Sequence, residues 1–430
     1  MTSLDGPPSS DSGVEDIPGT ATKLAMLTAI TRLVALAVSF VATATASHLI
    51  ISVYGPQAFA IAMLIMTFQQ LLSFTDFGMG GVVANLVRQS RTSGRQLDIL
   101  ALARPIKIVA LPPICTIIIL WVLFAVLHPP VSAWSVASLA LLLCSIPLTL
   151  GHRMLVGAQR TALATGLNAT ASIIAVAHVA LAVALNASQE VIYLAWPIGA
   201  VGSALLTTGV ALRVLRVPIA HLALATARSP MRSKANISLR DAIPLLTITI
   251  STPLAYGTDR LIIGAMATLE DVAVYSIASQ VYLPALSVVA STSLALWGET
   301  QAKKTLQARR LIFLLSCTGS VTISIGIPLY SHIVVGNSTY APTNLTIGFA
   351  VLLAANGWVS PMMMRFVTGK ALRFSATMVL LGAPLNIIGS LLLVGPLGVA
   401  GPVFMSTITL ILLQGIPLHL YTRNKLNAHG

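Results

Sequence analysis

Residues 24–72 read LAMLTAITRLVALAVSFVATATASHLIISVYGPQAFAIAMLIMTFQQLL, and Arg32 is the single Asp, Glu, Lys or Arg residue in this stretch. A transmembrane helix needs about 20 predominantly apolar residues, so the stretch is long enough for two. Tyr54, Gly55 and Pro56 interrupt it near the middle, and Gly and Pro are typical of turns. The stretch therefore predicts two membrane-spanning helices joined by a short turn.

The rest of the chain repeats this pattern. Of the 430 residues, 56% are hydrophobic and only 9% are charged, whereas soluble domains carry about 25% charged residues. Because a segment in lipid must satisfy its own backbone hydrogen bonds, apolar runs of this length form helices. The sequence thus predicts an all-α polytopic membrane protein. We expect twelve spanning helices, at residues 24–52, 57–87, 106–127, 132–156, 163–185, 191–213, 242–264, 272–298, 308–330, 344–367, 374–394 and 398–421.

The 25 Lys and Arg residues are distributed unevenly along the chain. Apart from Arg32 and Arg260, they all lie in the tails, in every second gap between the hydrophobic segments or at the segment ends beside those gaps, and the other gaps contain none. Basic loops stay on the cytoplasmic side of a membrane, so both termini are predicted to be cytoplasmic. The net charge of +13 does not indicate nucleic-acid binding, since the cations lie in short, separate loops.

Two similarities at nearly the same spacing indicate an internal duplication. Residues 54–60 and 268–273 each begin a helix after a short turn, and Arg153-x-x-x-Gly157 matches Arg365-x-x-x-Gly369. We expect two six-helix lobes related by a pseudo-twofold axis along the membrane normal, because an even number of helices preserves their orientation. The predicted boundaries are a disordered cytoplasmic tail at 1–22, an N-terminal lobe at 23–213, a cytoplasmic linker at 214–241, a C-terminal lobe at 242–422 and a cytoplasmic tail at 423–430.

Arg32, Asp259 and Arg260 are the first candidate binding residues. Arg32 lies within the first segment, and Arg260 follows Asp259 near the outer end of the seventh. A cation deep in a membrane helix costs about 2.5–3.5 kcal/mol on insertion scales. Facing a central cavity, the two arginines would attract an anionic group, and Asp259 would set the geometry or bind a coupling cation. Alternatively, Arg32 extends to the inner interface, and the Asp259–Arg260 pair forms interhelical ion pairs that fix packing.

Asp76, Arg153 and Arg365 are further candidates. Asp76 precedes several glycines in the second segment, where it would contribute to the binding site or pair with an arginine of the following loop. Arg153 and Arg365 stand at corresponding cytoplasmic ends of the fourth and tenth segments. They would form a symmetric basic gate at the inner mouth of the cavity, or they simply follow the preference for cations on the cytoplasmic side.

The sequence contains no catalytic motif that we recognise. We find no GxxxxGK[ST], HExxH or GxSxG pattern and no dinucleotide-binding glycine pattern. Cys115, Cys144 and Cys317 lie within apolar runs and form no CxxC pair. We therefore expect no enzymatic activity, no cofactor and no metal site. Transport would depend on an ion gradient, the membrane potential or the gradient of the substrate itself.

Several stretches resemble Wzx-type polysaccharide flippases. Residues 54–62, YGPQAFAIA, and 71–80, LLSFTDFGMG, are similar to the family's opening patterns LGPxxFGxY and LxDLGLG. Asp259-Arg-Leu-Ile-Ile-Gly264 is similar to its DRLLIG pattern, and Gly157-Ala-Gln-Arg160 to its GLQR pattern. Ala60 and Ala273 stand where the family prefers glycine, so the chain resembles a divergent member.

This resemblance implies membership of the multidrug/oligosaccharidyl-lipid/polysaccharide exporter superfamily, with two lobes and alternating access. It implies that an oligosaccharide linked to a polyprenyl diphosphate is moved across the bilayer of a bacterial inner membrane. A polysaccharide polymerase and glycosyltransferases would be partners. Arginine binds phosphate through paired hydrogen bonds, which suits a diphosphate. The alternatives are a cation-coupled drug or metabolite exporter of the same superfamily and a non-transporting scaffold for glycan-synthesis enzymes.

Overall fold

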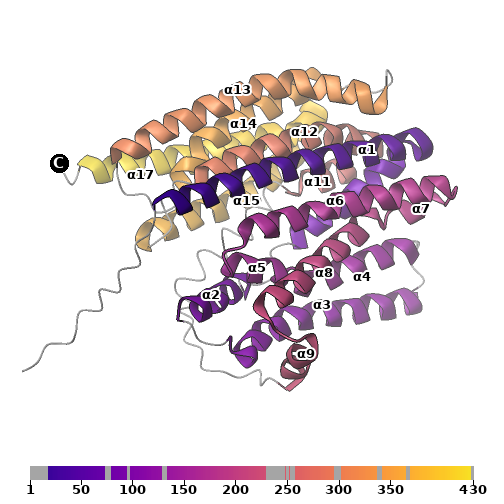
Figure 1. Cartoon of the computed structure of the whole chain (residues 1–430). Coiled ribbons are helices and arrows are strands. Elements are labelled where there is room, and N and C mark those ends of the chain that lie inside the picture. The colour runs from indigo at the N-terminus through magenta and orange to yellow at the C-terminus, as the bar shows by residue number, and fades with distance from the viewer. Residues whose placement is uncertain are drawn as a thin grey trace, which may run out of the picture.

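The computed structural model describes residues 18–72, 79–93, 97–127, 133–228, 257–294, 302–336, 341–364 and 369–427, together with Thr247 and Ser251. Within these ranges every regular element is a helix, and the long helices lie side by side (Figure 1). The predicted all-α architecture is confirmed. Asp76, Arg365 and most of the predicted seventh helix lie outside the described residues.

The first half of the chain forms one lobe. Its helices are α1 (Pro18–Leu72), α2 (Met79–Thr92), α3 (Ile99–Leu127), α4 (Ala133–Leu148), α5 (Leu150–Gly157), α6 (Thr161–Ala184), α7 (Gln189–Ile192), α8 (Ala195–Leu215) and α9 (Ile219–Arg228). The predicted turn in α1 is present, because Gly55 has φ 85° and ψ 170° and interrupts the helix. Glycine adopts such a positive φ without the steric cost of a Cβ atom.

One prediction in this lobe needs correction, and the structure adds a helix to a second. The expected single helix over 132–156 is divided into α4 and α5, which meet at Thr149. Pro147 lies two residues earlier, and proline lacks the N–H that a continuous helix would use. The expected linker over 214–241 contains the helix α9, which packs against α3 and accepts a hydrogen bond from Lys107 Nζ at the Ala227 carbonyl, 3.2 Å away.

The second half of the chain forms the other lobe. Its elements are α11 (Asp259–Met266), α12 (Leu269–Leu294), α13 (Ala302–Val335), α14 (Thr343–Met363), α15 (Gly369–Leu397), η1 (Gly398–Ala400), α16 (Gly401–Thr409), η2 (Leu410–Gly415) and α17 (Ile416–Asn427). A positive φ of 59° at Gly398 separates α15 from the final helices, as Gly55 divides α1. The elements α16, η2 and α17 follow one another without a gap, and the middle one, η2, is a π-helical segment.

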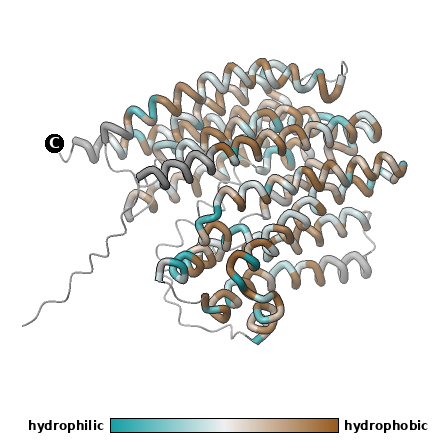
Figure 2. The backbone as a smooth tube through the Cα atoms, viewed as in Figure 1, coloured by the Kyte–Doolittle hydropathy of each residue, from teal (hydrophilic) through white to brown (hydrophobic). Residues whose placement is uncertain are grey.

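The described residues contain nine stretches long and apolar enough to cross a membrane. Two of these, Ile30–Phe68 and Ala371–Thr422, contain 39 and 52 residues and include the breaks at Gly55 and Gly398, so each accounts for two crossings. The side chains of Leu311, Ile325 and Leu392 are 67–71% exposed. Hydrophobic residues continue along the outer helices in Figure 2. Such exposure on many neighbouring turns fits a surface that faces lipid.

The two lobes meet mainly through α1, which lies between them (Figure 1) and packs against α11, α12 and α13. We call the end of the molecule with Arg91, Arg153 and Arg216 the basic end, and the end with Gly55 and α7 the distal end. The larger hydrophobic core joins both lobes, with Ile50, Phe59 and Met63 of α1 packed among residues of α12 and α14. A second core, around Val83, Leu102 and Leu155, lies wholly within the first lobe toward the basic end.

Candidate functional site

A cavity of about 710 Å³ lies between the two lobes. The first lobe contributes α1, α6 and α8 to its wall, and the second lobe contributes α11, α12, α14 and η2. Its volume is in the range of about 300–1,000 Å³ that is usual for ligand sites. Most lining residues are apolar, including Trp196, Phe349 and Met363.

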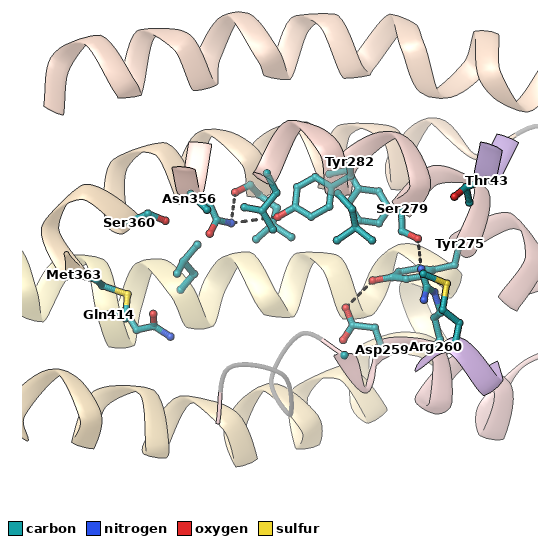
Figure 3. A pocket seen from close by; sticks show the side chains of 18 of the residues that line it. Thr43, Asp259, Arg260, Tyr275, Ser279, Tyr282, Asn356, Ser360, Met363 and Gln414 are labelled. Atoms are coloured by element: carbon teal, nitrogen blue, oxygen red, sulfur yellow. Dashed lines mark hydrogen bonds between the residues drawn. The ribbon is translucent and has the colours of Figure 1, made fainter. Parts of the chain in front are cut away.

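Among the described residues that line this cavity, Asp259 and Arg260 are the two that carry a formal charge. They occupy the first turn of α11 and are only 3% and 5% exposed. Figure 3 shows them at one end of the row of labelled residues, with Met363 and Gln414 at the other. Because α12 runs from the distal end toward the basic end, Arg260 lies at the distal part of the cavity and Met363 toward the basic end.

The hydrogen-bond partners of both charged groups are neutral hydroxyls. Arg260 Nη2 donates to Ser279 Oγ at 2.6 Å, and its Nη1 donates to Thr67 Oγ1 on α1 at 3.3 Å. The Tyr275 hydroxyl donates to Asp259 Oδ2 at 2.7 Å. Arg260 Nε and Asp259 Oδ1 are buried and have no hydrogen-bond partner among the residues that the structure describes. A buried polar group without a partner is costly, so these two atoms are candidates for binding a ligand.

Four residues on one face of α12 line the cavity next to this charged pair. Tyr275, Ser279, Tyr282 and Leu286 follow one another at spacings of three or four residues and all line the cavity. That spacing places side chains on one face of a helix. Tyr282 also accepts a hydrogen bond from Asn356 Nδ2 of α14 at 3.2 Å. These four residues therefore join the charged part of the cavity to its uncharged part.

Gln414 approaches the cavity from the π-helical segment η2. Its side chain is buried, and it lines the cavity together with Leu410. A π-helical turn carries one residue more than an α-helical turn, and such segments are frequent at functional sites. The π-helix thus sets the direction of an amide group that a regular helix would aim elsewhere.

Buried hydrogen bonds of Gln280, which follows the lining residue Ser279 on α12, join the lobes beside the cavity. Gln280 Nε2 of α12 donates to Ser47 Oγ of α1 at 3.0 Å, and the Tyr330 hydroxyl of α13 donates to Gln280 Oε1 at 2.6 Å. Closer to the distal end, His48 Nδ1 lies 3.1 Å from the Val334 carbonyl oxygen. We call Ser47, His48, Gln280 and Tyr330 the distal contact. The lobes are therefore held together beside the cavity.

Arg32 and Arg153, the other predicted site residues that the structure describes, do not line the cavity with Arg260. Arg32 is half-buried on α1 and does not line the cavity; it precedes the lining residue Thr43 by eleven positions, or about 16 Å of helix. Arg153 is exposed on α5 and lines a separate cavity in the first lobe. Asp76 and Arg365 cannot be compared, because they lie outside the described residues. The roles of all four residues stay predictions.

Sequence reasoning missed Tyr275, Ser279 and Gln280. Hydroxyl and amide residues occur throughout the helices of this chain, so none of them is conspicuous alone. The available signal was the spacing of Tyr275, Ser279 and Tyr282 on one helical face, which begins 15 residues after Arg260. That spacing would have indicated a shared face, but it gives no information on which helix the face meets.

The sequence matches a known protein family, and the structure matches the fold of solved proteins. A model of the family described as "Polysaccharide biosynthesis protein" matches residues 49–297, which is more than half of the chain. Among curated proteins, none matches the sequence significantly. Many solved structures, in contrast, share the fold.

Three of these solved structures show the kinds of protein and conformation that share the fold. A multidrug resistance MATE family transporter of the MOP superfamily in its inward-facing conformation has a TM-score of 0.62 and 14% identity, over 93% of this chain and 98% of that chain. An outward-facing structure of a MATE family transporter of the same superfamily has a TM-score of 0.63 and 14% identity, over 94% and 96%. The lipid II flippase MurJ in an inward closed conformation has a TM-score of 0.65 and 12% identity, over 93% and 87%. These similarities establish the two-lobe fold.

Proposed function

Because the chain belongs to the polysaccharide biosynthesis protein family, we propose that it translocates an oligosaccharide linked to a polyprenyl diphosphate across a bacterial inner membrane. The chain is a multi-pass membrane protein with the fold of MOP-superfamily exporters and flippases. In the proposed orientation the basic end faces the cytoplasm. The cavity between the lobes then takes up the head of the lipid from the cytoplasmic side.

The observation that carries this proposal is the environment of Arg260. Its guanidinium group is buried in a mostly apolar cavity, and Nε has no partner among the described residues. Burial of a cation is costly unless a partner compensates it. A diphosphate would supply that partner, because phosphate oxygens accept the paired hydrogen bonds that a guanidinium group offers.

The other predicted site residues would act at other stages of the proposed translocation. Arg32, closer to the basic end than Thr43, would meet the diphosphate earlier, and Arg153 with Arg365 would attract it to the entrance. Asp259 would orient the site through Tyr275, and Asp76 would contribute from the second segment. The distal contact between the lobes would then open as the cytoplasmic side closes, which gives alternating access.

The experiment compares Arg260→Gln, Arg260→Lys and the control Arg213→Gln in cells that lack the chromosomal gene. Arg213 is an exposed cation on α8 that does not line the cavity. We expect Arg260→Gln to lower export of surface polysaccharide at least tenfold and to trap lipid-linked glycan on the cytoplasmic leaflet. Arg260→Lys should restore part of the export and Arg213→Gln all of it. Normal export with Arg260→Gln would contradict the proposal.

One observation favours a second candidate, a cation-coupled drug or metabolite exporter. Asp259 lines the cavity, and its buried Oδ1 has no hydrogen-bond partner in the described part of the chain. A carboxylate oxygen in that position suits a coupling cation or proton. In this case Asp259→Asn would abolish drug resistance conferred by overexpression, while export of surface polysaccharide would be normal in cells without the gene. The opposite pair of results supports the flippase.

A further inference from the structure

A second cavity of about 460 Å³ lies inside the first lobe, between α4, α5, α6 and α8. It is separate from the large cavity between the lobes, but Ala171 of α6 lines both. Asn168 faces the second cavity and Ser172 the first, so a single turn of α6 divides them. Of the residues that line it, only Arg153 has a role in the proposed transport, as a cation at the entrance.

The buried part of the lining of this second cavity, here called its floor, includes three residues with hydroxyl groups. Ser145, Ser203 and Thr207 are 6%, 3% and 3% exposed. Ser145 donates its hydrogen to the Leu142 carbonyl at 2.6 Å, Ser203 to the Leu167 carbonyl at 3.1 Å, and Thr207 to the Ser203 carbonyl at 2.7 Å. A hydroxyl has one hydrogen and two lone pairs. Because the hydrogens are committed to the backbone, the floor presents acceptors.

The rim of the cavity has the opposite character. Arg153 and Asn168 are exposed, line the cavity and carry N–H donors. His152 lines the same side and is half-buried. The lining thus combines acceptor oxygens on its floor with a donor-rich and cationic rim, and it includes no Asp or Glu among the described residues.

The break between α4 and α5 holds this arrangement in place. Thr208 Oγ1 donates to the Leu148 carbonyl at 2.8 Å, which fixes α8 against the break. Gly151 lies directly against Thr208, and a Cβ atom at Gly151 would overlap that residue. The cavity wall is therefore formed before any ligand arrives, which lowers the cost of binding.

We infer that this cavity binds a sugar residue carrying an acidic group. Sugar hydroxyls would donate to the oxygens of Ser145, Ser203 and Thr207, and the acidic group would face Arg153 at the rim. The identification of this sugar as part of the transported glycan rests on the proposed function. The shared wall at Ala171 would allow one glycan to occupy both cavities, with its diphosphate at Arg260.

The test measures binding of glucuronate to the purified full-length protein in nanodiscs by ligand-observed NMR, with glucose and inorganic phosphate as the comparison ligands. Ala204→Leu places a larger side chain in the cavity wall, and Leu205→Phe changes the neighbouring exposed residue as its control. Arg153→Gln removes the rim charge, and Arg213→Gln is its control. Size-exclusion profiles and thermal unfolding verify that each variant is folded.

We expect the wild-type protein to bind glucuronate at least tenfold more tightly than glucose or phosphate. Arg153→Gln should remove this preference over glucose, Ala204→Leu should abolish binding, and both controls should bind as the wild type does. Absence of glucuronate binding, or its persistence in folded Ala204→Leu, would overturn the inference. Equal binding of phosphate and glucuronate would also overturn it, since the site would then recognise only an anion.

The same measurement separates this inference from the proposed function. Arg260→Gln should leave glucuronate binding unchanged, because Arg260 does not line the second cavity. If glucuronate binds as expected but glycan export is normal without the gene, the sugar site stands and the proposed function falls. If export depends on Arg260 but glucuronate does not bind, the proposed function stands and the sugar site falls.

Discussion

Arg260 acts in a pocket whose chemistry comes from its neighbours. The guanidinium group donates to Ser279 and Thr67, and Asp259 accepts from Tyr275, so neither charge is neutralised through these bonds. Hydrogen bonds to neutral hydroxyls lower the cost of burial but leave net charge for a ligand. Arg260 itself was identifiable from the sequence, because an arginine in an apolar segment is rare. Its partners were not, since hydroxyl residues are common in these helices and only packing selects among them.

Tyr275→Phe tests the support for Asp259. The change removes the donor to Oδ2 and leaves a second carboxylate oxygen unpaired, which costs about 1–3 kcal/mol for a buried group. We expect a lower midpoint of thermal unfolding in detergent. In an Asp259→Asn background the same change should have a clearly smaller effect. Equal effects in the two backgrounds would show that this hydrogen bond does not stabilise the fold.

The helices show where local sequence determines structure and where it does not. The break at Gly55 was predictable, because the Tyr-Gly-Pro turn falls between two long apolar runs. The division into α4 and α5, the helix α9 and the π-helical segment η2 were not expected. Proline within a membrane helix can bend it or end it, and the outcome depends on neighbouring helices. At the break between α4 and α5, the Thr208 hydroxyl of α8 donates a hydrogen bond to the Leu148 carbonyl.

Gly55→Ala tests the turn in α1. A Cβ atom at this position meets nothing within 4 Å, so its cost comes from the positive φ alone. We expect a loss of about 1–3 kcal/mol in stability, because this combination of φ and ψ is adopted almost only by glycine; the loss is seen as a lower midpoint of thermal unfolding. Gly209→Ala on α8 also meets nothing within 4 Å but carries no positive φ. That control should be neutral or slightly stabilising. Equal effects of the two changes would contradict this account of the turn.

Gln280→Leu tests the distal contact between α1, α12 and α13. The change removes the hydrogen bonds to Ser47 and Tyr330 without reducing side-chain volume greatly, so the lobes should separate more readily at this end. The reporter is Thr43→Cys in a background where Cys115, Cys144 and Cys317 are replaced by Ala. With Gln280 intact, a membrane-impermeant thiol reagent should reach this cysteine from the side of the basic end only.

With Gln280→Leu, the same reagent should also modify the cysteine from the distal side. The matched control is Leu283→Ala, which changes a cavity residue of the same helix outside the distal contact. If Gln280→Leu leaves accessibility from the distal side as low as the control does, the distal contact does not keep that side closed.

At the scale of the whole molecule, the charge pattern and the length of the apolar segments predicted the class of fold. The alternation of basic and uncharged gaps predicted twelve crossings. The two-lobe fold is confirmed by the structure and by the solved structures that share it. The relative placement of the lobes was not predictable, because it depends on contacts between residues far apart in the chain, such as Ser47 and Gln280. The same limit explains why Arg32 and Arg260, similar in sequence context, lie in different surroundings.

The most direct test of the central claim is a translocation assay with the purified protein in proteoliposomes. A fluorescent oligosaccharide linked to polyprenyl diphosphate is placed in both leaflets, and a membrane-impermeant reagent then quenches the label exposed outside. Wild-type protein and Arg213→Gln should expose most of the inner-leaflet label with time, and Arg260→Gln should slow this at least tenfold. Translocation by Arg260→Gln at the wild-type rate would contradict the account. It would also be contradicted if the wild-type protein, under an imposed ion gradient and membrane potential, moved no more label than protein-free liposomes do.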